Sequence, residues 1–235
     1  MERDGRLYDP YRQQIEPDGF ASIEELEQSR LAKFAALRRA FIDADVFIFT
    51  LGLTEAWTHQ ASGQEYSMCP GVIADSFNPE QVVFVNHGFR EVFGDIRRSI
   101  KIINRARKRN IRVLLTVSPV PLTATASDYH VLHATTYSKS ALRAAAGEFA
   151  QIHTGIDYFP SYDLITAPIS RGMHYASNMR QVTQDGIDHV MTHFFDAIRP
   201  SNASATTMNA EVDLEDPEED LNCDEIVLDG FAKKS

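Results

Sequence analysis

The chain has 235 residues, of which 43% are hydrophobic and 24% are charged, and its formal net charge is −10. Residues 201–235 contain ten acidic residues and two lysines, so residues 1–200 are close to neutral and lack the basic excess that nucleic-acid binding requires. No run of about 18 apolar residues exists, so we expect no membrane partner and no nucleic-acid partner.

The amino-terminal segment predicts a cytoplasmic protein and then a helix. The first 20 residues are charged and contain Pro10 and Pro17, so they lack the apolar middle region of a secretory signal. Ser22 and Glu25 have the spacing of a capping box, in which each side chain accepts a hydrogen bond from a backbone amide at the helix start. Apolar residues then recur on one helical face, which predicts a helix over 22–42.

Strands and helices alternate along the rest of the domain. Short apolar runs, too short for buried helices, predict interior strands at 45–51, 111–117 and 156–159, with a less clear fourth at 82–85. Apolar residues at three- and four-residue intervals or Ala-rich composition predict helices at 89–110, 137–152 and from about 183 to 198. The segment 58–79 is rich in glycine, proline and polar residues and is expected to be a long loop.

This alternation predicts an α/β fold, a three-layer α/β/α sandwich with a mostly parallel, doubly wound sheet of the flavodoxin type. Such sheets have about five strands, and only three are clear here, so we expect the sheet to be incomplete at the amino end. The domain is expected over 1–200. The remainder, 201–235, is acidic and poor in apolar residues, which predicts a disordered tail.

Two short runs follow predicted strands and hold small, hydroxylic or rigid side chains. They are TLGLTEAW (50–57) and TVSPVPLT (116–123). Ligands bind outside the carboxyl ends of parallel strands, so we expect both runs to line one crevice that holds a polar substrate. Gly52 provides either backbone amides for a substrate oxygen or a positive φ in the turn. Trp57 is either a stacking platform for a sugar or a core residue.

Other residues of the domain offer further contacts to a substrate. Ser118 ends a strand but precedes a proline, unlike a nucleophile on a glycine-rich turn. Lys139 and Arg143 are neighbours at helical spacing and either clamp an anionic substrate or lie on a solvated face. His130 and His133 share a helical spacing without an evident third ligand. We therefore expect no metal and no cofactor.

Four separated motifs resemble one family, in the family's order. TLGLTEAW (50–57), TVSPVPLTAT (116–125), YSKSALR (137–143) and YFPSYD (158–163) resemble the GSCFA domain family, a group similar to the SGNH hydrolases. The resemblance runs from about residue 9 to residue 195. It implies an α/β/α sandwich and an ester hydrolase or acyl transferase that acts on a small-molecule or glycan acyl ester.

The chain departs from this family at the residues of the reaction. It does not contain the Gly-Ser-Cys-Phe-Ala motif, whose serine is the family's presumed nucleophile. Thr54, followed by Glu55, stands where SGNH-like proteins carry the asparagine of a Gly-x-Asn block. An Asp-x-x-His pair is replaced by NMRQ at 178–181, so the base is expected to be the nearby His174, oriented by Asp163.

Two functions follow from these features. The first is an SGNH-like ester hydrolase or acyl transferase that binds substrate in the predicted crevice. The second is a non-catalytic partial domain that binds a ligand, or a protein partner that completes the sheet, because an exposed strand edge invites pairing.

Overall fold

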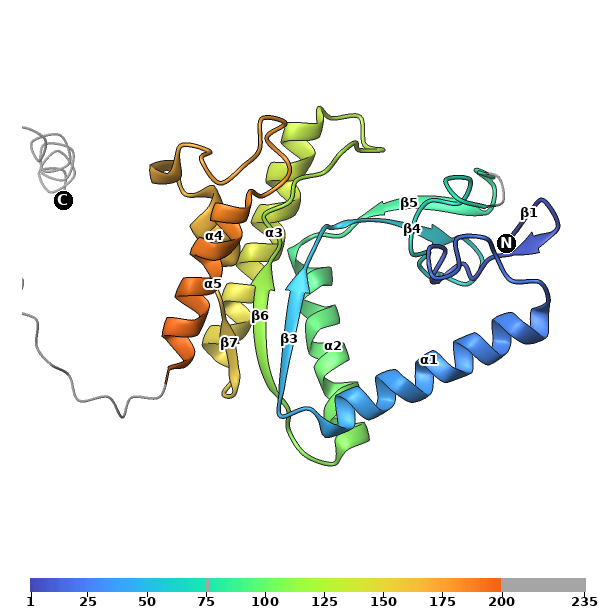
Figure 1. Cartoon of the computed structure of the whole chain (residues 1–235), viewed down its shortest axis with the longest axis horizontal. Coiled ribbons are helices and arrows are strands. Elements are labelled where there is room, and N and C mark those ends of the chain that lie inside the picture. Colours follow the sequence, from blue (N-terminus) through green and yellow to red (C-terminus); the bar gives the residue numbers. More distant parts are fainter. Residues whose placement is uncertain (75–76, 200–235) are drawn as a thin grey trace, which may run out of the picture. The chain divides into compact units, whose positions relative to one another are not determined.

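The computed structural model describes residues 1–74 and 77–199, and this part of the chain contains five α-helices and three small sheets (Figure 1). The central sheet has the strand order β3-β6-β7, and its neighbouring strands are parallel. Its members are β3 (Val46–Leu51), β6 (Arg112–Val117) and β7 (Ile156–Tyr158). The three strands expected from the apolar runs are therefore confirmed, and they form the expected parallel sheet.

Helices cover both faces of this sheet, because successive side chains of a strand point to opposite faces. On β3, Phe49 and Leu51 line a cavity with helix α2 (Phe89–Arg107), whereas Ile48 lines a cavity with helix α5 (Gln184–Ile198). Figure 1 shows α5 in front of the sheet and α2 behind it. Helix α3 (Val131–Ile152) packs beside α2, and the short helices α4 (Ser161–Thr166) and η1 (Pro168–Ser170) follow β7. The three-layer α/β arrangement is thus confirmed.

The hydrophobic core lies between the sheet and the pair α2 and α3. Leu115 of β6 and Phe149 of α3 are almost completely buried, and the ring of Phe149 packs 5.0 Å from that of Phe93 on α2. The apolar stripe of α2 is buried here, as its periodicity predicts. Its buried apolar members are Val92, Ile96, Ile100 and Ile103.

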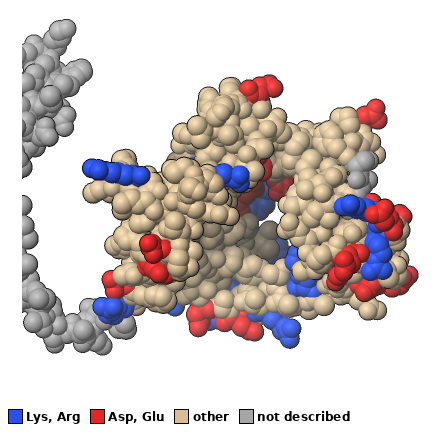
Figure 2. All heavy atoms as spheres, turned by 45° about the horizontal axis from the view of Figure 1, so that its top comes forward, with Lys and Arg blue, Asp and Glu red and all other residues tan. Residues whose placement is uncertain are grey.

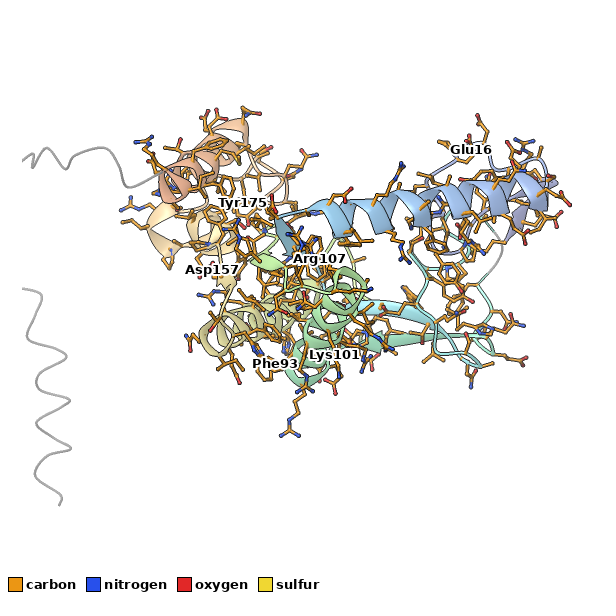
Figure 3. The ribbon with its side chains drawn as sticks, turned by 90° about the horizontal axis from the view of Figure 1, so that it is seen from below. Glu16, Phe93, Lys101, Arg107, Asp157 and Tyr175 are labelled. Atoms are coloured by element: carbon orange, nitrogen blue, oxygen red, sulfur yellow. The ribbon has the colours of Figure 1, made fainter. Side chains whose placement is uncertain are left out.

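Helix α1 (Ile23–Asp43) begins at the predicted cap. The amide of Glu25 donates to Ser22 Oγ at 3.2 Å, and the amide of Ala21 donates to the Glu25 carboxylate at 2.8 Å. At the other end, Arg107 of α2 donates to the carbonyls of Phe41 and Ile42, where a cation complements the helix dipole (Figure 3).

The apolar face expected along α1 is mostly uncovered. Leu26 is its one buried residue, whereas Leu31 and Phe34 are 68% and 54% exposed. In the described residues, no element packs over this middle stretch of the helix closely enough to bury it.

Two further sheets lie outside the central one. Strand β4 (Glu55–His59) pairs antiparallel with β5 (Val82–Asn86), and β1 (Glu2–Arg3) pairs antiparallel with β2 (Arg6–Leu7). The less clear strand expected at 82–85 therefore exists, but it belongs to a separate hairpin and not to the parallel sheet. Its partner β4 consists of the end of the run TLGLTEAW (50–57) and the start of the segment expected to be a loop (58–79).

In the described part of the chain the central sheet has two unpaired edges, because β3 and β7 each pair only with β6. On the face drawn in Figure 2, acidic and basic side chains are interspersed. None of the described helices is both long enough and apolar enough to cross a bilayer. The disordered tail expected over 201–235 lies outside the described residues.

Candidate functional site

The two motif-bearing strands end side by side. Leu51 of β3 lies beside Val117 of β6, and the amide of Ser118 donates to the carbonyl of Leu51 at 2.9 Å. The prediction that both runs leave the sheet at one edge is therefore confirmed. This is the carboxyl edge of a parallel sheet, where ligands bind in open α/β folds.

A side-chain contact joins the two runs beyond the strands. Thr125 Oγ1 donates to Glu55 Oε1 at 2.5 Å, and the Thr125 hydroxyl also lies 2.7 Å from that of Ser127. Glu55 is half-buried at the start of β4. The carboxylate of the first run is thus held by a hydroxyl that follows the second run.

Helix α3 holds both ends of the turn at residues 52–54. Lys139 Nζ donates to the carbonyl of Gly52 at 2.8 Å, and the amide of Thr54 donates to Ser138 Oγ at 3.0 Å. Lys139 is 1% exposed, and this burial lowers the pKa of its ammonium to about 8. The solvated helix face considered for Lys139 is therefore wrong, and its hydrogen-bond acceptor is backbone.

Thr54 has both of its donors engaged. Its hydroxyl donates to Asn86 Oδ1 at 2.7 Å, and its amide is bonded to Ser138. The carbonyl of Thr54 accepts from the amide of His87 at 2.9 Å. Thr54 is 1% exposed, so it fastens the turn after β3 to the end of β5.

A cavity of about 350 Å³ lies beside this turn, between β3 and α2. Its polar lining includes Thr50, Gly52, Thr54, Glu65, His87 and Asp95. His87 Nε2 lies 2.9 Å from Glu65 Oε1, and this pair was missed in the sequence because 22 residues separate its members. A histidine directly after a strand was the one available signal.

Ser118 lines a different cavity, on the opposite face of the sheet. This second cavity, of about 310 Å³, lies between the sheet and α5 and is also lined by Thr116 and Ser161. Thr50 lines both cavities. The single crevice expected from the two runs is therefore two cavities, because strand residues alternate between faces.

Arg143 and Asp163 form an ion pair that connects α3 to α4. Arg143 Nε donates to Asp163 Oδ1 at 2.9 Å, and Tyr158 donates its hydroxyl proton to Asp163 Oδ2 at 2.7 Å. Burial by itself raises the pKa of Asp163, but the hydrogen bonds from Tyr158 and Arg143 outweigh it and leave the pKa lowered. The guanidinium also lies 4.1 Å from the centre of the Tyr158 ring.

His174 is half-buried, and its ring stacks on that of His189 at a centroid distance of 4.9 Å. Its carbonyl accepts from the amide of Thr183, the residue that caps α5. In the described residues no hydrogen bond joins His174 to Asp163, so the pairing of this base with this carboxylate stays a prediction. Close by, the hydroxyl of Tyr175 donates to the carbonyl of Pro119 at 2.8 Å (Figure 3).

The structure bears on the alternatives for Trp57 and Gly52. Trp57 is half-buried on β4, and its ring packs 5.5 Å from Phe77, which is 48% exposed, and 5.4 Å from Phe84, so both alternatives for Trp57 stay predictions. Gly52 is not among the residues with a positive φ, and a Cβ there would meet nothing within 4 Å. The turn therefore does not require glycine for its backbone conformation.

No group of three or more histidine, cysteine, aspartate or glutamate residues within 1–74 and 77–199 could hold a metal ion. His130 instead caps α3, where its Nδ1 accepts from the amide of Leu132 at 3.2 Å.

Comparison with protein-family models gives a match. The model of the GSCFA family matches residues 5–194, a span that includes all four motifs and both cavities. A search of curated proteins finds no match.

Proposed function

The chain belongs to the GSCFA family, and from that premise we propose that it is an SGNH-like ester hydrolase or acyl transferase acting on a polar acyl ester, such as an acylated glycan. The observation that carries this proposal is the pairing of Leu51 with Val117 at the carboxyl edge of the parallel sheet. It gathers polar side chains and backbone around a cavity large enough for a small ester.

We assign the general base to His174. In hydrolysis the base takes a proton from water while the oxygen bonds to the acyl carbon, and the proton then passes to the departing alkoxide. In acyl transfer, a hydroxyl of the acceptor replaces the water. The imidazole must be neutral before the attack so that it can accept this proton.

Asp163 is assigned to orient that base. A carboxylate offers about four lone-pair sites, and the hydrogen bonds from Arg143 and Tyr158 leave it capacity for one more donor. Arg143 holds Asp163 ionised, which is the state that fixes an imidazole tautomer.

Gly52, Glu55, Trp57 and Ser118 are assigned to substrate binding, whereas Thr54, Lys139 and Arg143 are already bonded within the protein. Gly52 and Thr54 line the cavity beside α2, and Ser118 lines the cavity beside α5. Glu55 and Trp57 belong to β4, which leaves the same turn. The acidic residues of the first cavity, Glu65 and Asp95, favour a neutral polyol ester over an anionic one.

The test is turnover of p-nitrophenyl acetate by the wild type and by His174→Ala. We expect the variant to lose at least about 100-fold in kcat, the effect of removing a general base. His133→Ala is the matched control, because His133 is exposed on α3 and has no part in the proposed reaction. Equal, background-level turnover by wild type and His174→Ala would remove the enzyme proposal.

The free edge of β3 favours a second candidate, a partial domain that binds a protein partner completing the sheet. Val46 and Ile48 are 44% and 53% exposed, although interior parallel strands normally have both faces covered. Sedimentation and thermal unfolding test it. A monomer with one sharp unfolding transition and no binding of a hydrophobic dye would contradict dependence on a partner.

A further inference from the structure

Resting on the proposed function, we propose that the backbone N–H of Leu53 is the donor that binds the acyl oxygen as it becomes negatively charged, and that Lys139 is the positioning residue that polarises this peptide group. The proposal concerns the turn at residues 52–54, which leaves β3 and lines the cavity beside α2.

The hydrogen-bond donors of this turn differ in whether they already have a partner. Thr54 stands where a side-chain donor would be expected, but its hydroxyl already donates to Asn86 and its amide already donates to Ser138. In the described part of the chain, neither the amide of Gly52 nor that of Leu53 makes a hydrogen bond within the protein. Of the two, the Leu53 N–H belongs to the peptide unit whose carbonyl accepts from Lys139. Leu53 is 45% exposed and lines the cavity, so this residue borders space that a ligand could occupy.

The geometry of the peptide group connects this amide to Lys139. The carbonyl of Gly52 and the N–H of Leu53 belong to one trans peptide unit, so they point in opposite directions. Lys139 Nζ donates to that carbonyl at 2.8 Å. The N–H therefore points away from the ammonium, and a charged donor on the oxygen strengthens the same unit as a donor through its nitrogen.

Lys139 is suited to this role because its charge is buried and not neutralised. It is 1% exposed, and no carboxylate lies within ion-pair distance of it in the described residues. A cation in such a place acts through a low local dielectric, so its field reaches the cavity wall with little screening. Preorganised dipoles of this kind stabilise an oxyanion without reorganising during the reaction.

The charged groups around Lys139 are engaged elsewhere. On its own helix, Arg143 is paired with Asp163. From the strand β4 side, Glu55 accepts from Thr125, and from the β5 to α2 connection, His87 pairs with Glu65. On α2, which packs against α3, Glu91 accepts from the amide of Gly88 and Asp95 pairs with Arg98.

Burial alone accounts for the lowered pKa of Lys139, about 8. The ammonium is therefore mostly charged at pH 7 and mostly neutral at pH 9. We expect kcat to fall as the pH rises through this range.

The experiment is a pH profile of p-nitrophenyl acetate hydrolysis between pH 6 and 10, corrected for the uncatalysed reaction. We expect wild-type kcat to fall about tenfold from pH 8 to pH 9.5, because a neutral amine no longer polarises the peptide. Lys139→Met should have a kcat at least about tenfold lower at pH 7, and its kcat should not fall between pH 8 and pH 9.5. Lys139→Arg keeps its charge at every pH tested, so the decrease of kcat at alkaline pH should disappear and activity at pH 9.5 should be retained.

Lys101→Met is the matched control, because Lys101 is exposed on α2 (Figure 3). Its profile should equal that of the wild type. The proposal would be overturned by a pH profile of Lys139→Met identical to that of the wild type, or by an alkaline decrease of kcat that persists in Lys139→Arg. Leu53→Pro removes the N–H itself and should lose about 100-fold in kcat, whereas Leu53→Ala keeps the N–H and should lose far less.

A binding measurement separates this inference from the proposed function. Acetate, the carboxylate product, is titrated at pH 7 into isotope-labelled wild type and Lys139→Met, and backbone amide shifts are followed by NMR. A shift of the Leu53 amide that weakens in the variant supports the anion site even if the wild type has no turnover. No shift in the wild type overturns the inference, even if the enzyme is active through other residues.

Discussion

Ser138 and Thr54 are 84 positions apart in the sequence, and the Ser138 hydroxyl accepts the Thr54 amide at 3.0 Å with both residues buried. We predict that Ser138→Ala lowers the free energy of unfolding by about 1–3 kcal/mol, because it leaves a buried N–H without an acceptor. Urea denaturation measures the change. Ser140→Ala, on the exposed side of the same helix, should cost less than about 0.5 kcal/mol. Equal midpoints for the two variants would show that this bond does not hold the turn.

Lys139 gives stability an unusual dependence on alkaline pH. Its pKa is about 8 in the folded chain against 10.5 for an ordinary lysine, so between these values the unfolded chain binds more protons and stability rises with pH. The gain is absent below pH 8, complete above pH 10.5, and amounts to about 3 kcal/mol.

The measurement for this prediction compares wild type with Lys139→Met, so that all other titrating groups cancel. The wild type should gain stability relative to the variant as the pH rises from 8 to 10.5. A constant difference over this range would show that the ammonium is not destabilised by its surroundings.

Asp163 should change stability in the same direction as Lys139, with stability rising as the pH rises, but at acid pH. Burial raises the pKa of its carboxyl, but hydrogen bonds from Tyr158 and Arg143 dominate and lower it, so its contribution is present above about pH 4 and is lost as the pH falls. We predict that Asp163→Asn costs about 1 kcal/mol at pH 7 and loses less stability than the wild type on acidification.

Asp157→Asn is the control for that comparison, because Asp157 is exposed on the adjoining strand β7 (Figure 3). Chemical denaturation at pH 7 and at pH 3 measures both variants. If Asp163→Asn follows the wild-type curve at both pH values, the ion pair with Arg143 contributes nothing to folding.

The sequence predicted those elements whose pattern is local. The stripe of α2 repeats at three- and four-residue intervals, and the apolar runs of β3 and β6 are too short for helices, so each could be assigned without knowing its partner. The start of α3 was placed six residues late, because Val131 and its neighbours lack the alanine-rich composition of the rest. Their helix is set by the cap at His130.

Features that depend on distant partners were not predictable. Strand β4 is short and mixed in polarity, and it is defined by its pairing with β5 across a long connection. The burial of Lys139 also could not be inferred, because lysines at helical spacing are usually solvated. Only the fold brings the carbonyl of Gly52 to its ammonium.

The exposed strand β3 leads to a last prediction, about self-association. Ile48 is 53% exposed on a strand whose outer edge has no partner in the described residues, and apolar edge strands promote pairing between chains. Ile48→Lys should therefore reduce concentration-dependent association in sedimentation velocity, while changing the free energy of unfolding by less than about 0.5 kcal/mol. Ile102→Lys, on the 63% exposed surface of α2, should leave association unchanged. Equal association of the wild type, Ile48→Lys and Ile102→Lys would show that the chains associate through a surface other than this edge. It would also argue against the proposal that a partner binds there.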